Sequence, residues 1–279
     1  MPGRAIARAT TLVAAVAVAA FVVACGDDES SEPTSVAITA SGPKEDVTFE
    51  VPDEVDAGAA EITLTNSSEV ETDGQLVRVE GEHSEEEVIA ELGNAVQSRP
   101  VADWFIAEGG PVTTVPGDSS TATKDLEAGT YYLVPGDRPK SPLATFEVTG
   151  DDGADLPSAD STLTAQEYSF TADELPSGES KLLLDNKGAQ WHHFLVEKLA
   201  DGKTVEDAKE FFTSEEGGGP PPIDENTGFG STVIDAGQSQ IVDVNLTPGD
   251  YVAFCFVADK QGGPPHVVKG MVSGVTVAE

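Results

Sequence analysis

A β-strand that runs into a thiol is predicted by the segment Gly249-Asp250-Tyr251-Val252-Ala253-Phe254-Cys255. The 279-residue chain has two cysteines, and the other one, Cys25, lies close to the N-terminus. Cys255 is therefore a lone thiol. Such a side chain is either buried as a small hydrophobic group or held by a metal ion.

Further metal-binding side chains stand on both sides of this strand. Pro265-His266 follows after a segment rich in turn-forming residues, and Met271 lies five residues beyond the histidine. Upstream, His192 opens a hydrophobic strand. The chain holds only four histidines, and Met271 is its only methionine besides the initiator. Chance therefore explains the combination poorly.

This pattern resembles that of the blue-copper cupredoxins, and plastocyanin-like sequences in particular. The resemblance rests on the Gly-x-Tyr-x-x-x-Cys strand, the Pro-His pair, the His-x₄-Met spacing and the turn from Asn186 to His192. It implies that His192, Cys255 and His266 are equatorial ligands of one type 1 copper ion. Met271 would be the axial ligand. Two imidazoles, a thiolate and a weak thioether accommodate both oxidation states of copper, as one-electron transfer requires.

Two adjacent histidines compete for one ligand position. If Phe194 and Val196 face the core, the period of two along a strand places His192 on the same inward face and His193 on the other. We expect His193 to face solvent. The alternatives are that it orients the ligand loop or binds weakly elsewhere.

The chain repeats itself at an offset of 120 residues. For example, Glu61-Ile62-Thr63-Leu64-Thr65-Asn66 lines up with Lys181-Leu182-Leu183-Leu184-Asp185-Asn186. Self-similarity at this length indicates two copies of one domain. The predicted organisation is a lipoprotein signal peptide (1–24), an acidic tether (25–34), a first domain (35–150), a linker (151–157) and a copper-binding domain (158–279).

Strand signals dominate both copies, and the predicted fold class is all-β: two tandem cupredoxin-like Greek-key β-sandwiches, each with one short helix. Capping boxes at Ser84 and Thr204 predict where the helices begin. The first copy is expected to lack copper. Pro135 stands where Cys255 does, no methionine follows, and Asp73 falls near the position of His192.

The N-terminus predicts export and a lipid anchor. Arg4 and Arg8 precede an apolar run, Leu12 to Ala24, that is too short to span a membrane but suits a signal peptide. The ending Val-Val-Ala-Cys resembles the lipobox of bacterial lipoproteins, which implies a lipid on Cys25. The alternative is an ordinary secretory signal with an incidental cysteine. The net charge of −35 argues against nucleic acid and anionic headgroups as partners.

The leading functional prediction is a one-electron carrier, anchored by lipid at the extracytoplasmic face of the cell membrane. It would exchange electrons with a redox partner protein at the membrane, through the edge of His266. The alternative is a lipoprotein that captures or delivers copper, although the Met- or His-rich tracts usual in such proteins are absent. A metal-free protein with two degenerate domains is disfavoured by the intact ligand set. We expect no enzyme, because an oxidase-like second copper centre needs more histidines than this chain holds.

Overall fold

A computed structural model of the chain describes residues 32–134, 142–151, 153, 155–214 and 219–279. The predicted signal peptide, the proposed lipidation site Cys25 and most of the tether lie outside the described residues, as does Pro135. Within these residues, no helix combines the length and the apolar character needed to cross a membrane.

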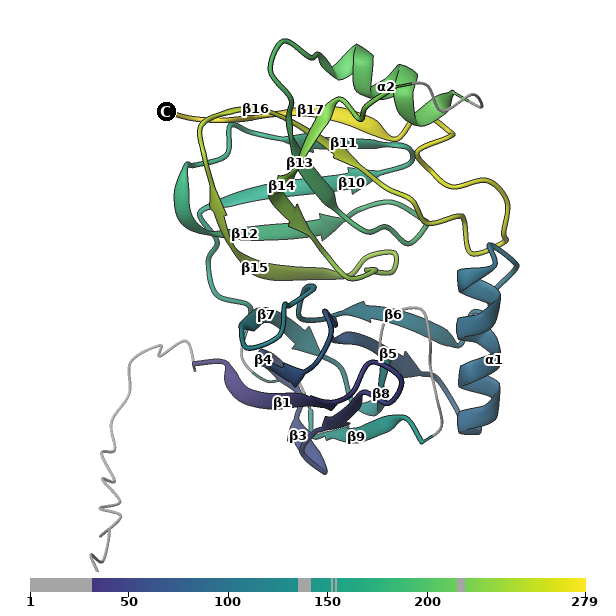
Figure 1. Ribbon diagram of the computed structural model, residues 1–279. Coiled ribbons are helices and arrows are strands. Elements are labelled where there is room, and N and C mark those ends of the chain that lie inside the picture. The colour runs from purple at the N-terminus through teal and green to yellow at the C-terminus, as the bar shows by residue number, and fades with distance from the viewer. Residues whose placement is uncertain (1–31, 135–141, 152, 154, 215–218) are drawn as a thin grey trace, which may run out of the picture. The chain divides into compact units, whose positions relative to one another are not determined.

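The two halves of the chain follow the same order of strands and helices, except that the first half has one additional short strand, at Glu54–Asp56 (Figure 1). The first half contains β1 (Thr34–Gly42), β2 (Thr48–Glu50), β3 (Glu54–Asp56), β4 (Gly58–Ser68), β5 (Gln75–Val79), α1 (Glu85–Val96), β6 (Phe105–Gly109), β7 (Ser119–Leu126), β8 (Gly129–Val134) and β9 (Ala144–Thr149). The second half contains β10 (Ser161–Gln166), β11 (Ser169–Ala172), β12 (Gly178–Asn186), β13 (Leu195–Leu199), α2 (Val205–Thr213), β14 (Ile223–Gly230), β15 (Ser239–Leu246), β16 (Gly249–Phe254) and β17 (Val272–Val277). The prediction of an all-β chain with two sandwiches, each with one short helix, is confirmed. The exact domain boundaries stay a prediction, and we call residues 35–150 domain 1 and residues 158–279 domain 2.

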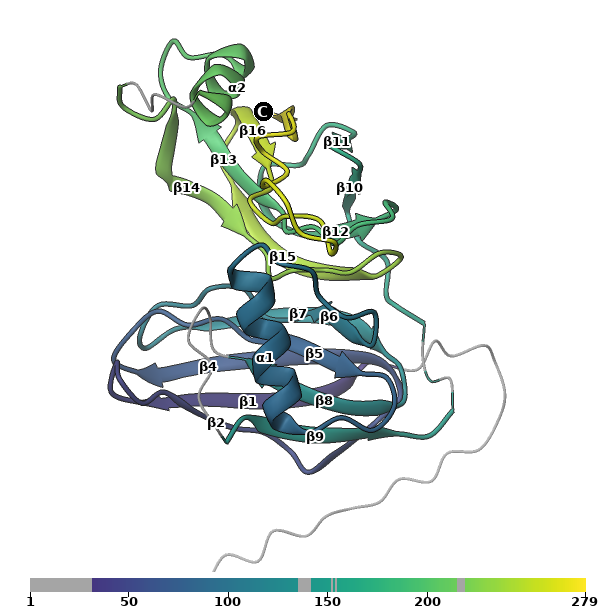
Figure 2. The same cartoon turned by 90° about the vertical axis from the view of Figure 1, so that its right-hand side faces the viewer.

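The two sandwiches share one sheet. Its strand order is β11-β10-β12-β15-β7-β4-β1-β2, so it runs through both domains. The joint is the antiparallel pair β15 and β7, in which Ile241 lies opposite Thr123 and Val242 opposite Ala122 (Figure 2). Each domain then packs its own second sheet against this one, with the order β3-β9-β8-β5-β6 in domain 1 and β14-β13-β16-β17 in domain 2.

The helices begin where the capping boxes place them. The Ser84 amide donates to the Glu87 carboxylate over 2.8 Å, and the Glu87 amide donates back to the Ser84 hydroxyl. Thr204 and Asp207 form the same reciprocal pair at the start of α2. Both pairs satisfy amide groups that have no partner within the helix, which is why helix formation starts there.

A buried tyrosine fixes the start of the strand that carries the thiol. The Tyr251 hydroxyl donates to the Thr247 carbonyl over 2.9 Å, and its ring is 1% exposed. Tyr131 makes the equivalent bond to the carbonyl of Glu127 in domain 1. This bond fastens the turn before β16 to the strand that leads into Cys255.

Candidate metal centre

Cys255 follows directly after β16, a central strand of the small sheet of domain 2. At the last paired position Phe254 lies opposite Leu195 of β13 on one side and Val272 of β17 on the other. One further step along this register sets Cys255 between Phe194 and Met271. The strands themselves therefore bring the thiol next to the histidine-bearing segment and to the methionine.

His192 enters the centre from the segment before β13. Its backbone pairs in both directions with Ile234, over 2.9 and 2.8 Å, so its position is held by main-chain bonds. The side chains of His192, Phe194 and Val196 are all fully buried, which confirms the predicted inward alternation.

His193 differs from the prediction that it faces solvent. Its Nε2 accepts a hydrogen bond from the amide of Phe256, over 2.9 Å, and its side chain is partly buried. Phe256 has left the paired part of β16, so its amide needs an acceptor outside the sheet. His193 thus holds the first residue of the loop after Cys255, which is the alternative in which it orients the ligand loop.

The loop from Cys255 to Met271 is closed by backbone hydrogen bonds. The amide of His266 donates to Val257 over 2.8 Å, and the amide of Val267 donates to Cys255 over 2.7 Å. The amide of Met271 donates to the His266 carbonyl over 3.0 Å. Cys255, His266 and Met271 are therefore fixed relative to one another by the main chain, whatever the side chains bind.

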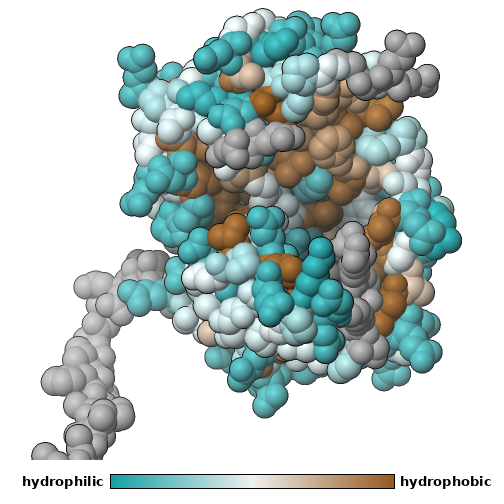
Figure 3. All heavy atoms as spheres, in the orientation of Figure 1, coloured by the Kyte–Doolittle hydropathy of each residue, from teal (hydrophilic) through white to brown (hydrophobic). Residues whose placement is uncertain are grey.

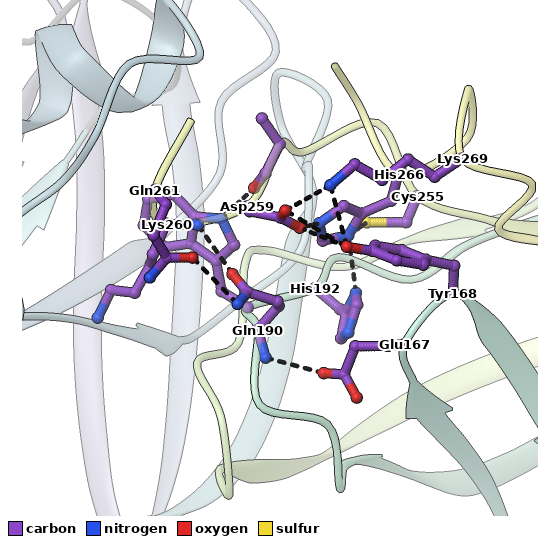
Figure 4. Close-up of polar contacts among 12 residues, drawn as sticks. Glu167, Tyr168, Gln190, His192, Cys255, Asp259, Lys260, Gln261, His266 and Lys269 are labelled. Atoms are coloured by element: carbon purple, nitrogen blue, oxygen red, sulfur yellow. Dashed lines mark hydrogen bonds and ion pairs between the residues drawn. The ribbon is translucent and has the colours of Figure 1, made fainter. Parts of the chain in front are cut away.

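The three donor groups converge on one point (Figure 4). One ligand atom of each of His192, Cys255 and His266 lies within 4.8 Å of the other two. The His266 Nδ1 is 3.0 Å from the His192 Nδ1 and 3.5 Å from the Cys255 Sγ. All three side chains are 0% exposed. Among the described residues this is the one such group of three His, Cys, Asp or Glu side chains.

Burial keeps these groups uncharged. It raises the pKa of the Cys255 thiol to about 12, although the backbone amides of His193 and Val257 act in the opposite direction. Burial, and then the neighbouring His266, lower the pKa of His192 to about 4. Neutral imidazoles offer free lone pairs, and a cation would stabilise the thiolate that burial disfavours.

The donor set fits copper. Two imidazoles and one thiolate form the equatorial set of a type 1 site, and no carboxylate belongs to the cluster. The His192 Nε2 is buried without a hydrogen-bond partner. It lies against Gly188, where a Cβ atom would come within 3.1 Å of it. The ring is thus held by packing, with its Nδ1 directed at the other donors, and copper is the cofactor that this buried set supports.

The role of Met271 as the axial ligand stays a prediction. The side chain is fully buried in the same hydrophobic cluster as Cys255 and Phe194. In domain 1, Thr72 pairs with Thr114 at the place where His192 pairs with Ile234, so Thr72 rather than Asp73 takes the position of the first histidine.

A polar cluster covers His266 and was not found from the sequence. The His266 Nε2 lies 2.9 Å from the Asp259 Oδ1, and the Tyr168 hydroxyl donates to the same oxygen over 3.0 Å. Lys269 contacts both Asp259 and the Tyr168 hydroxyl. A carboxylate at Nε2 keeps the proton on that nitrogen and leaves Nδ1 free for a metal. The His266 edge is therefore covered, and no spacing rule connects residues 168, 259 and 269.

No protein-family model matches the chain, and no curated protein matches it. Among solved structures, auracyanin from Roseiflexus castenholzii is 22% identical, with a TM-score of 0.28, over 42% of this chain and 95% of that one. An azurin from Methylomonas sp. strain J is 16% identical, with a TM-score of 0.27, over 42% and 96%. The copper nitrite reductase from Nitrosomonas europaea is 13% identical, with a TM-score of 0.24, over 89% and 95%. At such low identities and TM-scores these likenesses add nothing to what the side chains themselves show.

Proposed function

We propose that this chain is a one-electron carrier with a single type 1 copper ion, held at the extracytoplasmic face of the cell membrane by a lipid on Cys25. The observation that carries the proposal is the buried convergence of His192, Cys255 and His266. Copper bound to such a set supplies a one-electron couple. The lipid anchor, the compartment and a redox partner at the membrane rest on the N-terminal sequence alone.

The protein around the donors is built for a fixed geometry. Main-chain bonds hold His192 to Ile234, and Cys255 and His266 to their own loop. Backbone amides of His193 and Val257 point at the sulfur and would spread the charge of a thiolate. Ligands that barely rearrange between two oxidation states favour electron transfer.

Copper capture and delivery, the alternative, is less well supported by this geometry. Delivery requires a ligand that can be reached from outside. His192, Cys255 and His266 are each fully buried, and Asp259 and Tyr168 cover the outer edge of His266. A carrier that keeps its copper fits such a site better than a donor that releases it.

Electrons would pass near Phe256 rather than through an exposed His266. Phe256 is bonded to Cys255 and is 45% exposed, and Val268, two residues after His266, is 50% exposed. Figure 3 shows hydrophobic side chains gathered on the face below α2, in the half of the chain that holds the metal centre. Exposed apolar side chains beside a buried redox site suit the docking of a partner protein.

An oxidase or nitrite reductase would need a second copper centre. Two of the four histidines belong to the first centre. His83 stacks on Trp104 with ring centroids 3.7 Å apart, and His193 accepts from the amide of Phe256. The proposal is therefore a carrier without catalysis of its own.

The visible spectrum during titration with Cu(II) tests the proposal. Intense blue absorption at one copper per chain, bleached by a reductant and missing in the Cys255→Ser variant, would support it. A colourless protein that binds copper would favour the capture function instead. A protein that binds no copper would refute both.

A further inference from the structure

Domain 1 contacts the ligand loop of domain 2 through the chain just after α1. The amide of Val101 donates to the Lys260 carbonyl over 2.8 Å, and the amide of Gly263 donates to the Ser98 carbonyl over 3.1 Å. Figure 1 shows the end of α1 beside this loop. Ser98 has a φ of 53°, in the left-handed region that residues other than glycine rarely adopt. The loop between Cys255 and His266 is thus bonded to the other domain at two points.

The fit at this contact is close. Gly262 has a φ of +81°, and a Cβ atom there would lie 2.8 Å from the Ser98 carbonyl oxygen. The backbone of the loop therefore approaches domain 1 more closely than any side chain would permit. Asp259, three residues before Gly262 in the same loop, is the residue that holds His266.

Domain 1 also holds the segment that fixes His192. The side-chain amide of Gln75 bonds both backbone groups of Val233, accepting over 2.7 Å and donating over 3.1 Å. The amide of Asp235 donates to the Ala107 carbonyl over 2.7 Å. Val233 and Asp235 flank Ile234, the residue that pairs with the backbone of His192.

One ion pair joins the two contacted segments. The Lys260 ammonium lies 2.7 Å from the Asp235 carboxylate, and both side chains are largely buried, at 11% and 8% exposure. The same ammonium lies 5.8 Å from the centre of the ring of Trp191, the residue before His192. The Trp191 ring packs in one hydrophobic cluster with Val101 and other residues of domain 1.

We infer that domain 1 is the positioning element for the metal centre of domain 2: it holds both the His192 segment and the His266 loop, and so sets the ligand geometry. The inference rests on the proposed copper site. It gives a role to a domain that, among the described residues, carries no donor cluster of its own. If domain 1 were only a packing partner, disturbing the contact would change stability but not the properties of bound copper.

Two matched pairs of full-length variants test this. In Gly262→Ala the added Cβ atom would press against the Ser98 carbonyl oxygen. The control is Gly202→Ala, because Gly202 has a similar φ of +73° and a Cβ atom there would have no atom within 4 Å. Gln75→Leu removes both bonds from domain 1 to the backbone of Val233, whereas Gln97→Leu removes an exposed bond to the Gly93 carbonyl within domain 1. The first member of each pair should shift the reduction potential and the charge-transfer band, and weaken copper binding by about tenfold. The controls should not.

The readouts separate the possible failures. Potential, spectrum and affinity that match the controls in both Gly262→Ala and Gln75→Leu would overturn the inference, even if thermal stability fell. If Gly262→Ala does not fold, Gln75→Leu alone decides. A parent chain that binds no copper with blue absorption would instead refute the proposed function.

Discussion

The polar cluster beside His266 allows a direct test of how the protein sets the copper affinity and the reduction potential of its metal centre. The Asp259 Oδ1 lies 2.9 Å from the His266 Nε2. Asp259→Asn keeps the shape of the side chain and an oxygen that can accept from this nitrogen. It removes the negative charge, while the ammonium of Lys269 remains beside it. We expect weaker copper binding and a higher reduction potential.

The magnitude follows from the kind of hydrogen bond that is lost. A bond to a charged group contributes about 1.5 to 3 kcal/mol and a neutral one about half of that, so the change costs about 0.75 to 1.5 kcal/mol. The low end applies, because the Asp259 side chain is 18% exposed and water screens part of its charge. The affinity for Cu(II) should fall by roughly three- to fivefold. Cu(I) carries one charge fewer and loses less, so the potential should rise by up to about 40 mV.

The assay is a competition titration with a copper chelator together with a redox titration followed by absorption. Asp250→Asn is the control, since it removes the same charge from an exposed site at the start of β16, the far end of the strand from the thiol. The reasoning is wrong if Asp259→Asn matches this control in affinity and potential, or if its potential falls.

Three further changes test the frame around the centre. Lys124→Met should lower the free energy of unfolding, measured by urea denaturation, by about 3 kcal/mol. The reason is that Arg78 becomes the one cation left beside the buried Glu108 carboxylate. Tyr251→Phe should cost about 1 kcal/mol in the same assay, since the Thr247 carbonyl loses its bond. Hydrogen bonds from Thr204 lower the pKa of Asp207 below its ordinary value of 3.8. The ionised carboxylate therefore stabilises α2 fully above pH 3.8, and this stabilisation is lost as the pH falls through the lowered pKa. Asp207→Asn should therefore flatten the acid side of the curve of stability against pH.

Each of these expectations has an outcome that contradicts it. For the buried pair, the double change Glu108→Gln with Lys124→Met should recover most of the loss, and a double variant no more stable than the single one would contradict the account. For the tyrosine, Tyr131→Phe should cost the same as Tyr251→Phe, because it makes the same bond in domain 1. For the helix cap, the expectation is wrong if Asp207→Asn loses stability at acid pH in the same way as the parent protein.

Local patterns sufficed for the secondary structure and for the identity of the donors. The capping boxes at Ser84 and Thr204 are contained in four consecutive residues, so helix starts could be predicted without knowing what the helices pack against. The inward direction of His192 follows from strand alternation alone. Cys255 could be singled out because the only other cysteine lies at the N-terminus.

Contacts between distant segments could not be predicted in this way. His193 was expected to face solvent, yet it accepts from the amide of Phe256, 63 residues further along the chain. The His266 edge was expected to be the path for electrons, yet Asp259 and Tyr168 cover it. The sequence repeat indicated two separate sandwiches, whereas the pairing of β15 with β7 joins their sheets.

The all-β class and the duplication could be inferred from the sequence, because each depends on residue type and on spacing within one strand, one turn or one repeat. The three donors of the metal centre followed from the resemblance to the blue-copper cupredoxins. The tertiary structure alone decided which groups surround the donors and that domain 1 holds both ligand segments. Those contacts depend on how strands far apart in the chain are registered against one another. That registration is set by the packing of whole sheets, which no local spacing encodes.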